Sequence, residues 1–369
     1  EFRRVLFRSD TLFFYPTKGI DSILFVHETS LDTTEKDTGT VISVTYAGDT
    51  AYVINPWKDN GVNVRCSGAL VTVTANSGIK DLTYSLSGSS DNGTFNITSD
   101  KRFNLELNGV SLRNPSQAAI QVVKDVKVSV ILRDSTESYL SDSSTSSVKA
   151  VFLSKGQLVF SGKGILHVNG KYKHGIFSND YIRLLDGNIY VNEAVSDGMH
   201  ADYIQVYQGN LYLHGKTGME AEDSIVEISG GNVQITVDAE NGKAIKCVDT
   251  IHISGGTVTI NLTGNASKGL KSNRMVLFSG GSTQITASGT TVLDTVGRGY
   301  DPSYCTGIKC DGNVSITGNA QLNVLCGSSN AGGKCISTEG SVIVNSGSVK
   351  LVTAGAGAIY TDSAGTTDS

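Results

Sequence analysis

The chain has 369 residues, 42 of them glycine and only 4 proline, and a formal net charge of −5. This composition is typical of a turn-rich all-β protein and excludes a disordered chain, while the negative charge argues against a nucleic-acid partner. The sequence holds no apolar run of about 18 residues, so it predicts no membrane span.

The N-terminal third carries weaker signals. Residues 1–9, EFRRVLFRS, resemble a translated sequencing adapter, so we exclude them and expect the natural N-terminus and any signal peptide to be missing. Residues 10–37 show no defined pattern. Residues 38–100 alternate between apolar and polar without a clear period, and we expect an N-terminal β-cap there, because an open solenoid end exposes unpaired backbone groups.

A ladder of small residues begins at residue 164. Each member stands two residues before an apolar–x–apolar triplet: Gly164, Gly187, Gly209, Gly231, Gly256, Gly281, Ala320 and Gly347. The steps are 23, 22, 22, 25, 25, 39 and 27 residues. A period of this size with period-two alternation inside each unit is the mark of a solenoid.

Three columns of apolar residues should point inward. They are Leu184, Val206, Ile228, Ile253, Phe278 and Ile316; then Val191, Leu213, Ile235, Ile260, Ile285 and Val324; then Ile176, Met199, Met219, Ile245, Leu270, Ile308 and Ile336. Three short strands per unit suit one turn of a parallel β-helix, whereas a leucine-rich repeat or a propeller needs signatures or periods that are absent.

The sequence therefore predicts an all-β fold: a right-handed, single-stranded parallel β-helix over residues 101–362 behind the β-cap. We expect an insertion of half a coil at 290–306, carrying Arg298, Tyr300, Asp301 and Tyr304, and a frayed tail at 363–369. Among the six cysteines, Cys247 and Cys310 occupy a column of small residues and should be buried, while Cys305 could pair with Cys326 or Cys335 in an exported protein.

One string supports a family resemblance. FSGKGILHVNGKYKHGIFSNDYI (160–182), followed by DGMHAD, GMEAED and GIKCDG, resembles a bacterial secreted family of carbohydrate-binding domain-containing proteins, founded on a clostridial calcium-bearing β-helix. Earlier segments such as VISVTYAGDTAYV and LELNGVSL also fit, so the resemblance covers roughly residues 38–362. It implies a right-handed parallel β-helix, bound calcium and binding of plant-type polysaccharides, on a shape similar to that of pectate lyases.

The chain departs from the family at the start of each coil. The family's repeated Asp-Gly occurs here only as Asp197-Gly198. Elsewhere the Asp is replaced by His174, Thr217, Lys243, Lys268 or Thr306.

Carboxylates recur after the first strand of successive coils. Stacked carboxylates about 5 Å apart repel each other, and Ca²⁺, which takes oxygen ligands, would relieve the repulsion. Supported mainly by the resemblance, the candidate calcium ligands are Asp180, Asp197, Asp202, Glu220, Glu222 and Asp223. The competing interpretation is that acidic residues simply favour turns.

Two further columns are candidates for binding sugar. One outward position reads Phe177, His200, Glu220, Lys246, Lys271, Lys309 and Ser337. Its lysines, Lys246, Lys271 and Lys309, could bind the carboxylates of uronic acids, or form only a solvated face. Tyr190 and Tyr212 share another outward position beside Tyr207, and such rings can stack on sugars, although tyrosine is also common on exposed strands.

These observations predict a bacterial secreted or cell-surface protein that binds acidic or plant cell-wall polysaccharide with the help of Ca²⁺ and without catalysis. Two alternatives stay open. One is a calcium-dependent, pectate-type polysaccharide lyase, in which a Lys or Arg beside the metal would be the base. The other is a purely structural adhesin β-helix.

Overall fold

The computed structural model describes residues 40–361 apart from 77, 298, 328–332 and 355–358. The expectations for residues 1–9, 10–37 and 363–369, and for Arg298, lie outside the described residues. The described part belongs to one compact unit, Thr38–Ser369. All the secondary-structure elements in the described part are β-strands. Within this part no helix has the length and apolar character needed to cross a membrane.

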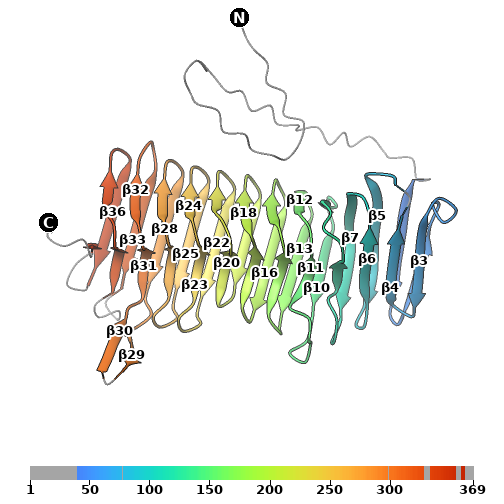
Figure 1. The fold of residues 1–369 in the computed structure, drawn as a ribbon, viewed down its shortest axis with the longest axis horizontal. Helices are drawn as coiled ribbons and strands as arrows, with labels where there is room; N and C mark the ends of the chain where they lie inside the picture. Colours follow the sequence, from blue (N-terminus) through green and yellow to red (C-terminus); the bar gives the residue numbers. More distant parts are fainter. Residues whose placement is uncertain (1–39, 77, 298, 328–332, 355–358, 362–369) are drawn as a thin grey trace, which may run out of the picture. The chain divides into compact units, whose positions relative to one another are not determined.

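The strands stack in three parallel ladders, and each coil passes through ladders C, A and B in turn (Figure 1). Ladder A contains β9 (Val128–Leu132), β12 (Leu158–Gly162), β15 (Tyr181–Leu184), β18 (Tyr203–Val206), β21 (Val226–Ile228), β24 (Thr250–Ile253), β27 (Met275–Phe278), β32 (Asn313–Ile316) and β35 (Val342–Val344). Ladder B contains β10 (Glu137–Ser141), β13 (Ile165–Gly170), β16 (Asn188–Ala194), β19 (Asn210–His214), β22 (Asn232–Val237), β25 (Thr257–Leu262), β28 (Ser282–Ala287), β33 (Gln321–Cys326) and β36 (Ser348–Thr353).

Ladder C contains β4 (Leu70–Ala75), β6 (Thr94–Ser99), β8 (Ile120–Val122), β11 (Ala150–Ser154), β14 (His174–Ser178), β17 (Asp197–Ala201), β20 (Thr217–Ala221), β23 (Lys243–Cys247), β26 (Lys268–Ser272), β31 (Thr306–Cys310), β34 (Lys334–Thr338) and β37 (Ile359–Thr361). The long strand β7 (Phe103–Arg113) pairs with both β9 and β10, and so begins ladders A and B together. The predicted all-β parallel β-helix is confirmed, with about 11 turns.

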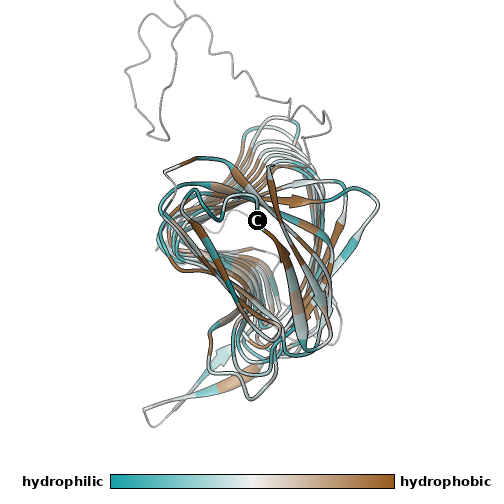
Figure 2. Ribbon diagram, turned by 90° about the vertical axis from the view of Figure 1, so that its right-hand side faces the viewer, coloured by the Kyte–Doolittle hydropathy of each residue, from teal (hydrophilic) through white to brown (hydrophobic). Residues whose placement is uncertain are grey.

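The predicted inward columns form the core. Every member of all three columns is at most 1% exposed, and Figure 2 shows the coils superimposed along the solenoid axis. Register pairs each member with its equivalent one coil away, as with Met199 and Met219 or Ile260 and Ile285. Burial of apolar side chains at about 25 cal/mol per Å² is the main stabilising contribution of such a stack.

The turns explain the ladder of small residues. Gly209 has φ +87°, and a Cβ there would lie 2.3 Å from the carbonyl oxygen of Gly187 in the preceding coil. Beside it, the Asn210 side-chain amide donates to Asn188 Oδ1 at 2.7 Å. Glycine is required because the backbone is left-handed and the neighbouring coil leaves no room.

Two antiparallel hairpins lie at the N-terminal end of the stack. β1 (Val41–Ala47) pairs with β2 (Thr50–Ile54), and β3 (Val62–Ser67) pairs with β4. Parallel pairing starts in the same segment, where β1 pairs with β5 (Leu82–Ser90) and β4 pairs with β6. The segment expected as a cap thus contains both the antiparallel hairpins and the first parallel coil.

The insertion expected at 290–306 is an antiparallel hairpin, β29 (Val292–Val296) and β30 (Gly299–Ser303), that projects from the body of the solenoid (Figure 1). All six cysteines are free thiols, and only Cys66 is exposed. Cys247 and Cys310 are buried in the stack as expected, and Cys305 forms no disulfide with Cys326 or Cys335.

Candidate functional site

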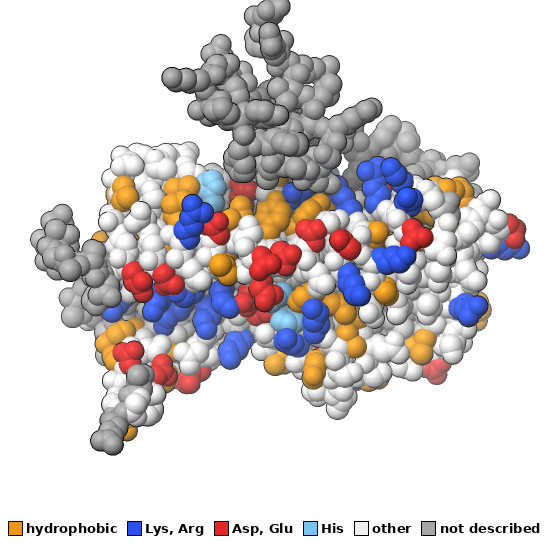
Figure 3. Space-filling model, viewed as in Figure 1, with side chains coloured by type: hydrophobic (Ala, Val, Ile, Leu, Met, Phe, Trp, Pro, Cys, Tyr) orange, Lys and Arg blue, Asp and Glu red, His pale blue; other side chains and the backbone are white. Residues whose placement is uncertain are grey.

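The outer surface of ladder C carries the charged columns. Register aligns His200, Glu220, Lys246, Lys271 and Lys309 along this surface, one residue per coil. Figure 3 shows acidic and basic side chains gathered side by side over the middle of the solenoid. Parallel stacking in register therefore converts a repeat position into a continuous charged stripe.

Five lysines from three consecutive coils form what we call the basic cluster: Lys243, Lys246, Lys268, Lys271 and Lys309. Lys246 pairs with Glu220, and Lys271 Nζ lies 2.6 Å from Asp311 Oδ1. Within the described ranges, Lys309 forms no ion pair. The cluster therefore has more positive charge than its acidic partners neutralise.

Two members of the basic cluster hold their charge at a cost. Burial, followed by repulsion from Lys246, lowers the pKa of Lys243. Burial, followed by repulsion from Lys309, lowers the pKa of Lys268 from 10.5 to about 8. A bound anion would offset both effects, because it favours the charged form of each lysine.

The structure brings three of the predicted calcium ligands together. Asp180, Asp202 and Asp223 follow the ladder C strand by one or two residues in successive coils and form what we call the acidic column. The backbone N–H of Asp202 donates to the Asp180 carbonyl at 2.8 Å. Burial, followed by repulsion from Asp223 and Asp180, raises the pKa of Asp202. Such repulsion is what a hard cation would relieve.

The other three predicted ligands have partners of their own. Glu220 pairs with Lys246, and Glu222 Oε2 lies 3.0 Å from His200 Nε2. Asp197 is 3% exposed, and its Oδ2 lies 2.8 Å from Nδ1 of both His174 and His200. Asp197 is therefore part of a histidine cluster and separate from the acidic column.

Sequence reasoning missed this histidine cluster. Among the described residues it is the one group of His, Cys, Asp and Glu side chains close enough to hold a metal ion, with its three ligand atoms within 4.8 Å of one another. The available signal was His174 at a coil start, one coil before Asp197-x-x-His200. Burial disfavours the charged form of Asp197, yet both imidazoles outweigh it and hold its pKa well below the usual range.

The predicted tyrosine pair belongs to a longer row of stacked aromatic rings on the strands of ladder B, which we call the aromatic ladder. Tyr190 and Tyr212 have ring centroids 6.3 Å apart. His167 stacks on Tyr190 at 5.2 Å, and Tyr139 stacks on His167 at 4.7 Å. The rings come from β10, β13, β16 and β19, beside a shallow hollow of about 80 Å³ lined in part by Asn232. The sequence indicated half of this ladder.

Tyr207 does not join that ladder. It follows β18 in ladder A, and its hydroxyl donates to Gln205 Oε1 at 2.9 Å. Nearby, the Arg183 guanidinium lies 4.1 Å from the ring centroid of Tyr181 and donates a hydrogen bond to the Tyr203 hydroxyl at 3.0 Å. Tyr207 therefore lies in a separate aromatic group with its hydroxyl engaged.

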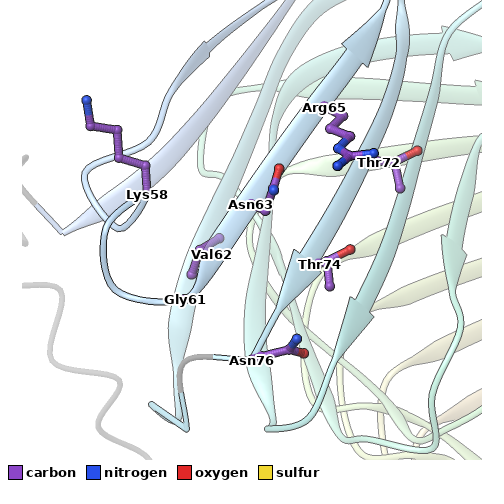
Figure 4. Close-up of a pocket in the computed structure, with 8 residues that line it drawn as sticks. All are labelled: Lys58, Gly61, Val62, Asn63, Arg65, Thr72, Thr74 and Asn76. Carbon is purple, nitrogen blue, oxygen red and sulfur yellow. The ribbon is translucent and has the colours of Figure 1, made fainter.

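A wider hollow of about 560 Å³ lies over the hairpin of β3 and β4, away from the charged columns. Figure 4 shows Lys58 pointing away from the other lining side chains, while Arg65 lies beside Thr72. Its side chains do not converge on a common point, so we assign no chemistry to it.

A family model for carbohydrate-binding domain-containing proteins matches residues 67–357. The chain belongs to this family. The predicted family resemblance is therefore confirmed over most of the solenoid. The chain is also similar to the solved structure, a gadolinium derivative, of a polysaccharide lyase-like protein from C. thermocellum, with 20% identity, 84% of this chain and 99% of that chain covered, and a TM-score of 0.46. No curated protein matches the chain.

Proposed function

We propose that this member of the carbohydrate-binding domain-containing family binds an acidic polysaccharide along the outer surface of ladder C. The observation that carries the proposal is the basic cluster, whose charge exceeds that of its ion-pair partners Glu220 and Asp311. Lysines in register on strands about 4.8 Å apart match a polymer that presents carboxylates repeatedly. The family description, which names carbohydrate binding, supports the choice of ligand class.

The proposal includes a bacterial secreted or cell-surface location, where polymeric glycans occur. It also includes Ca²⁺ at the acidic column, formed by Asp180, Asp202 and Asp223. Burial is the main cause of the raised pKa of Asp202, and repulsion among these carboxylates is the second cause. A hard cation shared with uronate carboxylates would remove that repulsion.

The aromatic ladder is proposed as a second contact surface for sugar. The faces of Tyr190 and Tyr212 offer apolar area for sugar rings while the hydroxyls stay in water. The aromatic ladder lies on the strands of ladder B and contains no lysine of the basic cluster. Its contribution to sugar binding should therefore not depend on the ligand's charge.

The first experiment is calorimetric titration of the protein with oligogalacturonate and with the same oligosaccharide fully methyl-esterified. We expect the charged form to bind more tightly than the esterified form, and its binding to weaken as salt is added. Lys309→Gln should weaken binding about tenfold, as expected for loss of one charge-assisted hydrogen bond. Lys80→Gln, an exposed lysine outside the basic cluster, is the matched control. Equal affinity for both oligosaccharides would reject an acidic ligand.

The calcium component has its own test. Thermal unfolding in Ca²⁺ should occur at a higher temperature than in EDTA, because an ion that binds only the folded state stabilises it by mass action. Asp202→Asn should shrink the difference, whereas Asp134→Asn, on an exposed turn, should leave it unchanged. A melting temperature indifferent to Ca²⁺ in the wild-type protein would remove the metal from the proposal.

A specific observation keeps a lyase as a second candidate: the pKa of Lys268, lowered to about 8, is in the range of a general base. Its Nζ is nonetheless engaged, since it donates to the Ala266 carbonyl at 2.9 Å. A lyase would release an unsaturated product that absorbs in the ultraviolet. Absence of this product from polygalacturonate and other uronate polymers would exclude the candidate. Absence of any glycan binding as well would favour a structural adhesin.

A further inference from the structure

Three side chains converge from two adjacent strands. His174 is the first residue of β14, and Asp197 and His200 are the first and fourth residues of β17. Nδ1 of each histidine lies 2.8 Å from the same oxygen, Asp197 Oδ2. The side chains of His174 and Asp197 are 3% and 4% exposed, and that of His200 is 12% exposed. Two imidazole nitrogens and a carboxylate oxygen thus meet in a nearly dry site, and His200 is its most exposed member.

The contact of His174 is close but misdirected. Within the part of the chain that the structure describes, His174 Nδ1 has no hydrogen-bond partner, although Asp197 Oδ2 is 2.8 Å away. A buried polar atom without a directed partner costs about 1–3 kcal/mol. The protein's own hydrogen bonds leave this nitrogen without a partner, and an ion between the three side chains would be coordinated by it.

Glu222 fixes the orientation of His200. Its Oε2 lies 3.0 Å from His200 Nε2, on the side of the ring opposite Asp197. When the Nε2–H donates to this carboxylate, the Nδ1 lone pair is free to bind a metal ion. A histidine ligand whose other nitrogen donates to a carboxylate is the usual outer arrangement of metal sites in proteins.

The face of the His200 ring is fixed as well. Phe177 stacks on it with centroids 4.8 Å apart and an interplanar angle of 12°, and the Lys149 ammonium lies 3.4 Å from the Phe177 centroid. The same phenyl ring also contacts His174 at 5.5 Å. Both imidazoles are therefore held in place by packing, which reduces the entropy lost on binding an ion.

We propose that His174, Asp197 and His200 bind one divalent transition-metal ion, through Nδ1 of each imidazole and one oxygen of the carboxylate. Two neutral imidazoles favour zinc, cobalt, nickel or copper over the hard ion calcium. Ligand bonds of about 2.0–2.1 Å at tetrahedral angles place ligand atoms about 3.3 Å apart. The two Nδ1–Oδ2 separations are 2.8 Å and all three ligand atoms lie within 4.8 Å of one another, distances that bracket this spacing.

Three protein ligands leave a fourth position open, as in catalytic and substrate-binding zinc sites rather than in structural ones. The site does not depend on the glycan proposal, because it needs neither the basic cluster nor the acidic column. It is also chemically distinct from the calcium ligands proposed there.

The test uses the full chain, freed of metal by chelation and without any glycan. Titration with Co²⁺, followed by its visible ligand-field absorption, should give one site, and Zn²⁺ should displace the cobalt. His174→Gln and His200→Gln should each abolish the absorption band. Glu222→Gln should weaken Co²⁺ binding about 10- to 100-fold, as loss of an outer carboxylate does.

His214→Gln is the matched control, because His214 also contacts one carboxylate, Asp238, at 3.0 Å but belongs to no three-residue group. It should retain the full cobalt spectrum. Thermal unfolding checks the fold of each variant, and the more exposed His200→Gln decides the result if His174→Gln does not fold. Absence of a cobalt band in the wild-type protein, or a band that survives in folded His200→Gln, overturns the proposal.

Discussion

Lys268 keeps its charge where the surroundings disfavour it. Its folded-state pKa is about 8, below the ordinary 10.5, mainly because of burial. Below pH 8 both the folded and unfolded chains are protonated, so the full cost of the buried charge is present. Between pH 8 and about 10.5 the unfolded chain binds more protons, so the free energy of unfolding rises with pH.

Replacing Lys268 by methionine should remove that slope. We expect the free energy of unfolding of Lys268→Met to exceed that of the wild type most below pH 8, by at most about 3 kcal/mol. This difference should shrink between pH 8 and 10.5. Hydrogen bonds lost at the Ala266 carbonyl reduce the gain by a constant amount. The measurement is the melting temperature of both proteins from pH 6 to 10.5, with Lys80→Met as control. Parallel curves would show that Lys268 is not the cause.

Single positions also show what the sequence could and could not predict. The register of Lys246, Lys271 and Lys309 followed from counting, because a solenoid repeats each position at the same place. The burial of Lys268 did not, since its Nζ contacts Ser303 and Tyr304 at the base of an inserted hairpin. Convergence of His174 on Asp197 likewise depends on rotamers in adjacent coils, which no period encodes.

The strands of ladder B carry a second expected effect. Tyr190→Ala removes the centre of the aromatic ladder, between His167 and Tyr212. Loss of one stacking partner should weaken oligosaccharide binding by about 0.5–1.5 kcal/mol, up to roughly tenfold. The salt dependence of binding should stay unchanged, because no charge is removed.

The measurement is calorimetric titration at two salt concentrations, with Tyr300→Ala as control. Tyr300 is a tyrosine that is 74% exposed on the hairpin strand β30, outside both proposed surfaces. An affinity that is the same in Tyr190→Ala and in the wild type would leave the aromatic ladder with a structural role only.

The sequence predicted where the strands lie better than it predicted which strands pair with each other and in which direction. Alternation and spacing located the ladders, because inward residues such as Met199 and Ile245 must be apolar in every coil. The insertion was visible as a break in the period, but its antiparallel pairing of Val292–Val296 with Gly299–Ser303 was not. At the N-terminal end the alternation indicated strands, but the direction in which β4 pairs with β3 and β6 depends on tertiary contacts.

The solenoid as a whole behaves as a stack in which each coil contacts only its neighbours. Register pairs Lys243 with Lys268, so deletion of residues 243–267 joins Gly242 to an equivalent position one coil later. After the deletion β26 can pair with β20 as β23 does, with Leu270 in place of Ile245 above Met219. The shortened chain should therefore fold, with a β-sheet circular dichroism spectrum and a lower melting temperature.

The same deletion separates the proposed sites. It removes Lys243 and Lys246 from the basic cluster, so affinity for oligogalacturonate should fall, while the histidine cluster on β14 and β17 keeps its neighbours and should still bind Co²⁺. Deleting only residues 243–256 is the control, because half a coil brings Thr257 of ladder B next to Gly242 and breaks the register. That chain should unfold or aggregate. Equal behaviour of the two deletions would contradict the view that whole coils are the independent units of this molecule.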